Sequence, residues 1–234
     1  MNSKQFTTEG IVLSRTDYNE ADRILTFLTP DHGKVRAIAK AVRKTKSKLA
    51  GGIELFSISE LTFVVGRGEI HTLISSRLGK HYAKITKDLD RTNAGYELIK
   101  QTAKATEDAP EPAYFDLLKA GFEALDNNDI GLELIKAWFG AQLLKQAGHT
   151  PNLHTDVNGE KLQAKQKYEF NFDSMAFQHS QVARDAFGAD QIKFLRLLFS
   201  GNKLEVLQKI QKSDRLARQV QPIIGSMLQL FIRS

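Results

Sequence analysis

The first eighty residues constrain the fold most, because short segments of alternating apolar and polar residues follow one another with only turns between them. The segments are TEGIVLSR (8–15), DRILTFLTP (22–30), KVRAIAKAV (34–42), LFSISELTFVV (55–65) and EIHTLISSRL (69–78). Turn residues join neighbouring segments at DHG (31–33) and GRG (66–68), as in β-hairpins. Five strands with no helix between them favour a small closed β-barrel, and the OB-fold is the commonest five-stranded kind.

Helical spacing replaces this alternation from about residue 81. The pattern predicts helices within 84–108, 113–129 and 130–149, with APEP (109–112) as a break and Gly148 as a C-terminal cap. YEFNFDSMAFQ (168–178) predicts a hairpin that turns at Asp173-Ser174, and 190–234 is helical again, with Ser213 as an N-cap. We therefore expect an α+β chain with an OB-fold domain at 1–80. A mostly helical domain follows at 81–234, with a small β-hairpin insertion at about 149–178.

Composition narrows the class of protein. The chain has 234 residues, 41% of them hydrophobic, which is enough for a sizeable core. It has no cysteine, which excludes disulfides, a thiolate nucleophile and cysteine-ligated zinc. The most apolar stretch, at 222–232, is too short for a bilayer core of about 30 Å, and the start carries no apolar signal segment. We expect a cytoplasmic protein with no membrane association.

Positive charge is concentrated in one segment. The net charge is +6, and the first eighty residues hold +5 of it. Residues 33–52 contain no acid and seven cations: Lys34, Arg36, Lys40, Arg43, Lys44, Lys46 and Lys48. On a strand, Lys34, Arg36 and Lys40 would face outward, while the small apolar residues between them would pack inside the barrel. Such a face and loop are typical of proteins that follow a nucleic-acid backbone.

We therefore predict nucleic-acid contacts at these seven cations and at Arg67 in the GRG turn. Base stacking would need exposed aromatic side chains. Phe27 and Phe63 lie in apolar runs typical of a core, so Tyr18, in a polar turn, is the better candidate. Backbone contacts with little sequence preference are the expected mode of binding.

No catalytic constellation is visible in the sequence. A GxxxxGK[ST] phosphate loop is absent, and the dense acids DLD (88–90) and DNND (126–129) look like a helix surface and a turn rather than a nuclease metal site. The chain is thus expected not to be an enzyme. An RNA-binding barrel protein and a non-catalytic scaffold for an acidic partner stay open as alternatives.

Residues 10–73 also carry a specific series of features in order. These are Glu20 after a polar turn, Thr29-Pro30 at a strand end, a His32-Gly33 turn, a basic strand and loop ending at Ser47-x-Leu49, and then Phe56. A second segment, FGAQLLKQAGHTPNL, occupies 139–153. Both resemble the RecO family of bacterial recombination mediators.

The resemblance implies an amino-terminal OB-fold and a helical carboxy-terminal domain. It implies binding of single- and double-stranded DNA, annealing of complementary strands, and help in loading RecA onto DNA coated by single-stranded DNA-binding protein. The implied partners are RecR and the acidic C-terminal tail of the single-stranded DNA-binding protein. The implied location is the nucleoid, within the cytoplasm. Many members also carry a four-cysteine zinc module after the Pro-x-Leu position, which this chain lacks.

Metal binding is therefore not expected. His149, His154 and Asp156 are too loosely spaced in a turn-rich stretch to replace a closed tetrahedral zinc site. The 168–178 hairpin should be held by Phe170 and Phe172 or their neighbours, without metal or other cofactor.

The acidic tail, with its apolar end, should bind an apolar groove rimmed by cations. DQIKFLRLLFS (190–200) offers Lys193 and Arg196, three residues apart and so on one helix face, as candidate partner-binding residues.

Overall fold

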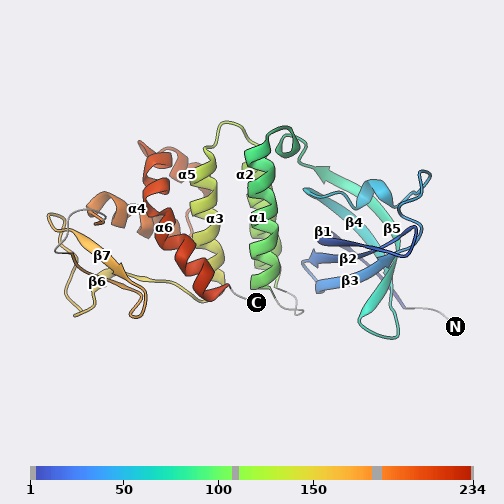
Figure 1. The fold of residues 1–234 in the computed structure, drawn as a ribbon, viewed down its shortest axis with the longest axis horizontal. Coiled ribbons are helices and arrows are strands. Elements are labelled where there is room, and N and C mark those ends of the chain that lie inside the picture. The colour runs from blue at the N-terminus through green and yellow to red at the C-terminus, as the bar shows by residue number, and fades with distance from the viewer. Residues whose placement is uncertain (1–3, 107–110, 181–185, 233–234) are drawn as a thin grey trace. The chain divides into compact units, whose positions relative to one another are not determined.

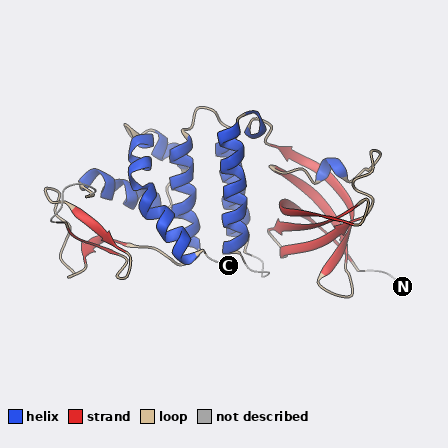
Figure 2. Cartoon of the chain, in the orientation of Figure 1, coloured by secondary structure: helices blue, strands red, loops and turns tan. Residues whose placement is uncertain are grey.

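The computed structural model describes residues 4–106, 111–180 and 186–232, so part of the APEP break lies outside the described residues. The chain divides into two compact units, Met1–Asn127 and Asn128–Ser234. Strands dominate the first and helices the second, and Figures 1 and 2 show their elements. No helix within the described ranges is both long and apolar enough to cross a membrane.

The first unit begins with a five-stranded barrel. Its strands are β1 (Gln5–Tyr18), β2 (Asp22–Thr29), β3 (Gly33–Ala39), β4 (Ser57–Val64) and β5 (Ile70–His81). They pair in the order β1-β2-β3-β5-β4 and close because β1 also pairs with β4. Only the β3–β5 pair is parallel among these five pairings. This is the expected OB-fold barrel. β3 is shorter than the predicted 34–42, because Ala41 takes a left-handed conformation with φ +54°.

The barrel core follows the predicted alternation. Val35, Ala37 and Ala39 of β3 are buried, at 4% exposure or less, while Arg36 and Lys40 between and after them are exposed. The rings of Phe27 and Phe63 meet inside at 5.6 Å between centroids, with neither exposed. The small side chains of β3 leave room for these rings, and the prediction that both aromatics are core residues is confirmed.

Two helices complete the first unit: α1 (Leu89–Ala105) and α2 (Pro112–Leu125). The Asp88 carboxylate caps α1 by accepting the Arg91 backbone N–H at 2.9 Å. Phe56 packs between the helices and the barrel, 5.6 Å from the Phe122 ring, and Lys80 of β5 pairs with Glu123 of α2 at 3.1 Å. The helices therefore share a core with the barrel. The domain boundary expected at residue 80 stays a prediction.

The second unit is built around α3 (Leu132–Gln146), which is buried on nearly every side. α6 (Ser213–Phe231) packs closely on α3, since a Cβ on Gly140 would lie 2.7 Å from Ile224. α4 (Ala189–Phe199) and α5 (Leu204–Gln208) complete the group. Gly148 follows α3 with φ +82° and donates its N–H to the Lys145 carbonyl at 3.1 Å, which confirms the predicted C-terminal cap.

The predicted N-cap of the last helix is displaced by one residue. Ser213 is the first residue of α6 and is buried, while Lys212 stands at the cap position with φ +62°. The Ser213 N–H donates to the Ile210 carbonyl at 3.1 Å, so a tight turn rather than a serine side chain begins the helix.

A small sheet lies beside the helices of the second unit. It consists of β6 (Asn152–Asp156), β7 (Tyr168–Asn171) and β8 (Ala176–His179), in the order β6-β8-β7. β7 and β8 form the predicted hairpin: Asn171 Oδ1 accepts the N–H groups of Asp173 and Ser174, both at 3.0 Å. Phe177 is fully buried 5.2 Å from the Phe170 ring. Aromatic packing thus occupies the centre of the hairpin. The parallel strand β6 was not predicted.

Candidate nucleic-acid interface

The predicted cations Lys34 and Arg36 lie on the outer face of β3, and Lys40 follows directly after the strand. Lys34 is half-buried, and Arg36 and Lys40 are exposed. Arg36 NH1 lies 3.8 Å from Glu69 Oε2. Because β5 pairs in parallel with β3, the β4–β5 turn that contains Arg67 lies beside the first half of β3. Since exposed ion pairs at this distance are weak, Arg36 stays free to exchange its partner.

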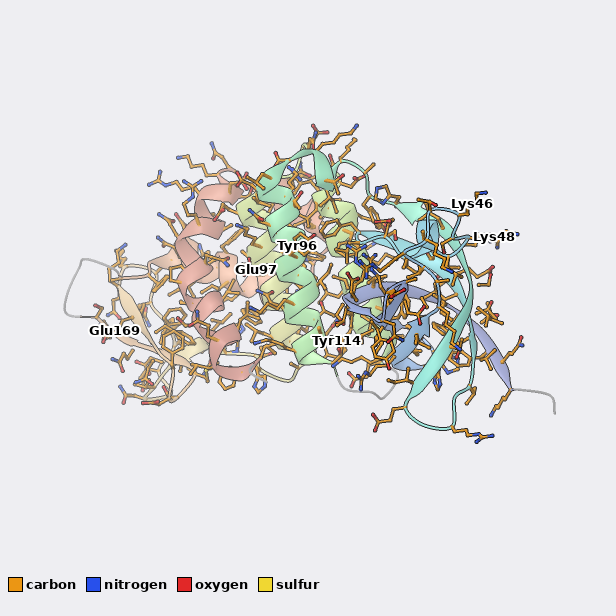
Figure 3. The ribbon with its side chains drawn as sticks, turned by 45° about the vertical axis from the view of Figure 1, so that its right-hand side comes forward. Lys46, Lys48, Tyr96, Glu97, Tyr114 and Glu169 are labelled. Atoms are coloured by element: carbon orange, nitrogen blue, oxygen red, sulfur yellow. The ribbon has the colours of Figure 1, made fainter. Side chains whose placement is uncertain are left out.

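The basic loop, which follows β3 and contains Arg43, Lys44, Lys46 and Lys48, is hydrogen-bonded to the barrel at both ends. At its start, the Ala41 N–H donates to Asp22 Oδ1 at 2.7 Å and the Arg43 N–H to the Ala21 carbonyl at 2.9 Å. At its end, Ser76 Oγ donates to the Leu49 carbonyl at 2.8 Å. The side chains of its cations, Arg43, Lys44, Lys46 and Lys48, are nonetheless exposed, and Figure 3 shows those of Lys46 and Lys48 extending away from the barrel. The loop is thus an anchored platform for exposed cations.

The eight predicted cations follow β3 from end to end. Arg67 belongs to the turn beside the first half of the strand, and the loop cations follow its last residue, Ala39. The strand rises about 3.3 Å per residue, so the set spans several phosphates of an extended nucleic-acid strand. This arrangement suits contacts to a backbone better than a pocket for a single anion.

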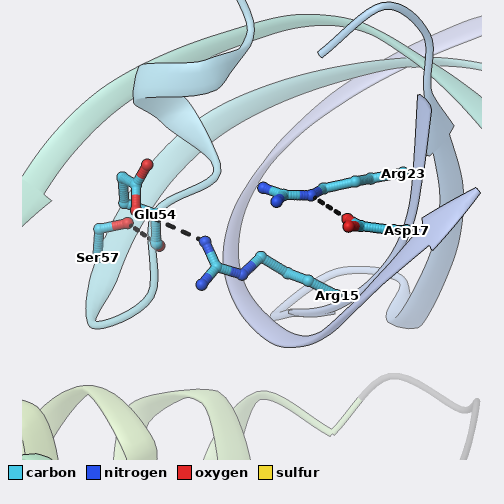
Figure 4. Close-up of polar contacts among 5 residues, drawn as sticks. All are labelled: Arg15, Asp17, Arg23, Glu54 and Ser57. Atoms are coloured by element: carbon cyan, nitrogen blue, oxygen red, sulfur yellow. Dashed lines mark hydrogen bonds and ion pairs between the residues drawn. The ribbon is translucent and has the colours of Figure 1, made fainter. Parts of the chain in front are cut away.

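A cluster of charged residues at one end of the barrel was missed by the sequence reasoning. Arg23 Nε of β2 donates to Asp17 Oδ1 of β1 at 2.7 Å, and Arg43 NH2 lies 3.6 Å from Asp17 Oδ2. Arg15 NH1 lies 3.6 Å from Glu54 Oε2. Figure 4 shows Arg15 reaching toward Glu54, and Arg23 toward Asp17. The Arg23 hydrogen bond, assisted by the nearby Arg43 charge, holds the pKa of Asp17 below its usual range.

A β-bulge in β1 explains this cluster. Val12 pairs with Phe27, but Ser14 already pairs with Thr26, so Leu13 is the extra residue. Beyond the bulge, Arg15 pairs with Leu25 and Asp17 pairs with Arg23. These pairs lie on the face of the sheet that, further along β2, lines the barrel core. Simple alternation could not place these residues. One signal was available: Asp17 and Arg23 lie at equal distances from the turn and carry opposite charges.

Tyr18, the predicted stacking candidate, ends β1 opposite Asp22 and is 46% exposed. Its ring is therefore accessible, at the strand position next to the Asp17–Arg23 pair. A stacking role stays a prediction.

The candidate metal ligands do not converge. His149 stacks on Phe231 at 4.2 Å between ring centroids, and His154 lies exposed on β6. The Asp156 carboxylate accepts the N–H groups of Asn158 and Glu160, both at 2.9 Å. No three His, Asp or Glu residues within the described ranges are placed to hold a metal ion. The three candidate ligands therefore do not come together as a zinc site.

The two predicted partner-binding residues lie in different surroundings. Lys193 lines a groove of about 570 Å³ between α4 and the start of α6. Lys212 and Arg215 add positive charge to this groove, Asp190 adds one negative charge, and Leu197 and Leu216 add apolar surface. Arg196 instead donates its Nε–H to the Leu153 carbonyl of β6 at 2.8 Å. Lys193 and Arg196 both line a small hollow of about 60 Å³.

Comparisons with known proteins cover almost the whole chain. The family described as Recombination protein O N terminal matches residues 1–82, and Recombination protein O C terminal matches 91–232. A protein of Dehalococcoides mccartyi strain 195 named DNA repair protein RecO is 36% identical over 165 residues, which make up 70% of this chain and 64% of that relative. The protein of the same name from Bifidobacterium adolescentis is 30% identical over 226 residues, covering 94% of this chain and 91% of the relative. The chain therefore belongs to the RecO family.

Proposed function

We propose that this chain is a DNA-binding mediator of recombination in DNA repair. It binds single- and double-stranded DNA, anneals complementary strands, and helps load RecA onto DNA coated by single-stranded DNA-binding protein, without catalysis of its own. The observation that carries the proposal is the row of cations along β3 and its loop, in a segment 33–52 that contains no acid, with Arg67 in the β4–β5 turn beside β3. The relatives named DNA repair protein RecO support a role in repair.

Phosphate contacts explain why such a surface would tolerate many DNA sequences. Lysine and arginine side chains that replace condensed counterions give affinity that depends on salt and hardly on base order. Because Phe27 and Phe63 are inside the barrel, they are not available for stacking, and the half-exposed Tyr18 is the aromatic side chain best placed to meet a base. Binding through the backbone supports non-specific recognition of DNA.

Annealing follows from the same contacts. Two complementary strands repel each other through their phosphates, and a cationic surface lowers this repulsion while leaving the base edges free to pair. The exposed Lys44, Lys46 and Lys48 on an anchored loop suit this role, since their long side chains can adjust to one or two strands.

The partners complete the proposal. The groove lined by Lys193, Lys212 and Arg215 would take the acidic tail of the single-stranded DNA-binding protein, with the apolar end of the tail against Leu197 and Leu216. RecR is the second partner, and RecA is reached indirectly through the DNA. Arg196, the second predicted partner-binding residue, lies outside this groove and donates to the Leu153 carbonyl, so a contact with the tail would require this hydrogen bond to be exchanged.

The test is annealing of complementary DNA strands coated by the cognate single-stranded DNA-binding protein. The protein should speed pairing, and the Lys44/Lys46/Lys48 triple alanine variant should not. Matched DNA and RNA strands of one sequence, compared over a range of salt, test the RNA-binding alternative: clearly tighter binding to RNA would overturn the proposal. Absence of any nucleic-acid binding would leave a scaffold for an acidic partner.

A further inference from the structure

The arginine cluster at the end of the barrel has the composition of an anion-binding site that is occupied by carboxylates of the protein itself. Three guanidinium groups, from Arg15, Arg23 and Arg43, face two carboxylates, from Asp17 and Glu54. We propose that these three arginines bind a DNA phosphate, and that Asp17 occupies the site in the free protein and is exchanged for the phosphate on binding. This inference rests on the proposed function, because it adds a site to the same DNA-binding surface.

The geometry leaves donors for a phosphate. Arg23 contacts Asp17 through Nε, so the two terminal nitrogens of its guanidinium have no partner among the described residues. Arg43 and Arg15 meet their carboxylates only at 3.6 Å, beyond hydrogen-bond distance. A guanidinium has five N–H donors in a planar fork, which matches a phosphate as well as a carboxylate. The cluster therefore holds oriented donors that the carboxylates do not saturate.

Exposure makes the exchange possible. The side chain of Asp17 is 52% exposed, and those of Arg23 and Arg43 are 31% and 39% exposed. Ion pairs at such positions are screened by solvent and contribute little, so Asp17 can move aside at small cost. When Asp17 moves away, three arginines remain with one carboxylate, that of Glu54. The site then has a net positive charge that can bind one phosphate.

The position of the cluster connects it to the basic loop. The Arg43 N–H donates to the Ala21 carbonyl in the β1–β2 turn, so the loop begins beside the cluster. A strand lying along β3 and the loop would pass the end of the barrel there. In OB-folds the face of β2 and β3 and the β1–β2 loop are common contact regions for oligonucleotides.

A carboxylate inside a phosphate site sets how tightly DNA is held. Asp17 orients Arg23 and Arg43 before DNA arrives, and it competes with the phosphate afterwards. Competition speeds release, which suits a protein that must hand its DNA to another. A purely structural ion pair predicts the opposite effect of removing the carboxylate, and this difference in sign makes the proposal testable.

The test is binding of a fluorescent oligothymidine strand to the full chain by anisotropy, over a range of salt. Asp17→Asn keeps the shape of the side chain and should tighten binding by about fivefold at low salt. Arg23→Gln should weaken binding and lower the salt slope by about 0.7. Glu9→Gln on the same strand removes one acid outside the cluster and is the matched control for net charge. It should change affinity much less than Asp17→Asn.

Each other outcome is decisive. Unchanged or weaker binding by Asp17→Asn, or equal tightening by Glu9→Gln, overturns the exchange. If Asp17→Asn lowers the melting temperature so far that the barrel unfolds, Glu54→Gln takes its place, because it frees Arg15 by the same logic and should also tighten binding. The Lys44/Lys46/Lys48 triple alanine variant separates the two proposals. If that variant loses DNA while the cluster variants behave as wild type, the basic surface stands and the phosphate site is wrong.

Discussion

The ring of Phe56 lies against Gly95: a Cβ placed on this glycine of α1 would be 2.6 Å from the Cε1 atom of Phe56. Phe56 follows the basic loop, immediately before β4, and has φ +55° at 2% exposure. A left-handed backbone is costly for a phenylalanine, so packing against α1 must hold it there. Through this contact, the segment that ends the basic loop depends on the helices of the first unit.

Gly95→Ala should destabilise the protein. The added methyl group must displace a buried ring, which outweighs the gain of about 1 kcal/mol in helix propensity. We expect a net loss of about 1 kcal/mol in the free energy of unfolding, measured by denaturant titration. Gly225→Ala in α6 is the matched control, because a Cβ there meets nothing within 4 Å. That change should stabilise its helix, and a loss there equal to that at Gly95 would argue against the packing explanation.

A fragment of residues 1–127 should be more stable than a fragment of residues 1–80. In the shorter fragment, Phe56 would lose the cover that Phe122 gives it. Thermal unfolding followed by circular dichroism compares the two directly. Equal melting temperatures would show that the barrel is a domain of its own, ending at about residue 80.

The barrel could be predicted because its signal is local. Alternation along β3 assigned Val35 and Ala37 to the core and Arg36 to the surface, and turn residues marked the ends of the strands. The arginine cluster could not be predicted in this way, since the bulge at Leu13 reverses the alternation for Arg15 and Asp17. A bulge is set by the pairing of two strands, and no single segment announces it.

Non-local pairing also explains the missed strand. β6 has five residues, of which Leu153 is buried and His154 exposed, and it pairs in parallel with β8, more than fifteen residues later. Its short alternation could not be told from a turn. Sequence reasoning did not place Lys212 and Arg215 beside Lys193 for a similar reason, since these two residues come from the start of α6 and the residue before it, which are distant in sequence.

The purified protein should contain no stoichiometric zinc. The Asp156 carboxylate is occupied by its own turn, and His149 stacks on Phe231 rather than facing His154. Elemental analysis after purification without chelator is the measurement. A ratio near one zinc per chain would contradict the view that aromatic packing alone holds the small sheet.

The Lys193→Glu/Arg215→Glu double variant should lose binding to a peptide with the acidic, apolar-ended sequence of the tail. Both side chains line the same groove, and reversing them turns attraction into repulsion. Fluorescence anisotropy with a labelled peptide measures the loss, which should exceed tenfold, on the order of 1.4 kcal/mol. Lys203→Glu/Lys209→Glu, at the two residues that flank α5, reverses two exposed charges outside the groove and should bind as wild type. Equal binding by both variants would move the tail site elsewhere.

The salt dependence of DNA binding tests the central claim most directly. The Lys44/Lys46/Lys48 triple alanine variant is compared with wild type and with Lys87/Lys100/Lys104 triple alanine, a matched change at exposed positions of the helical part of the first unit. If the loop lysines contact phosphates, the first variant lowers the slope of log affinity against log salt for single-stranded DNA by about 2, equally for unrelated sequences, while the control keeps the wild-type slope. An unchanged slope and affinity in the loop variant would contradict binding of DNA along β3 and its loop.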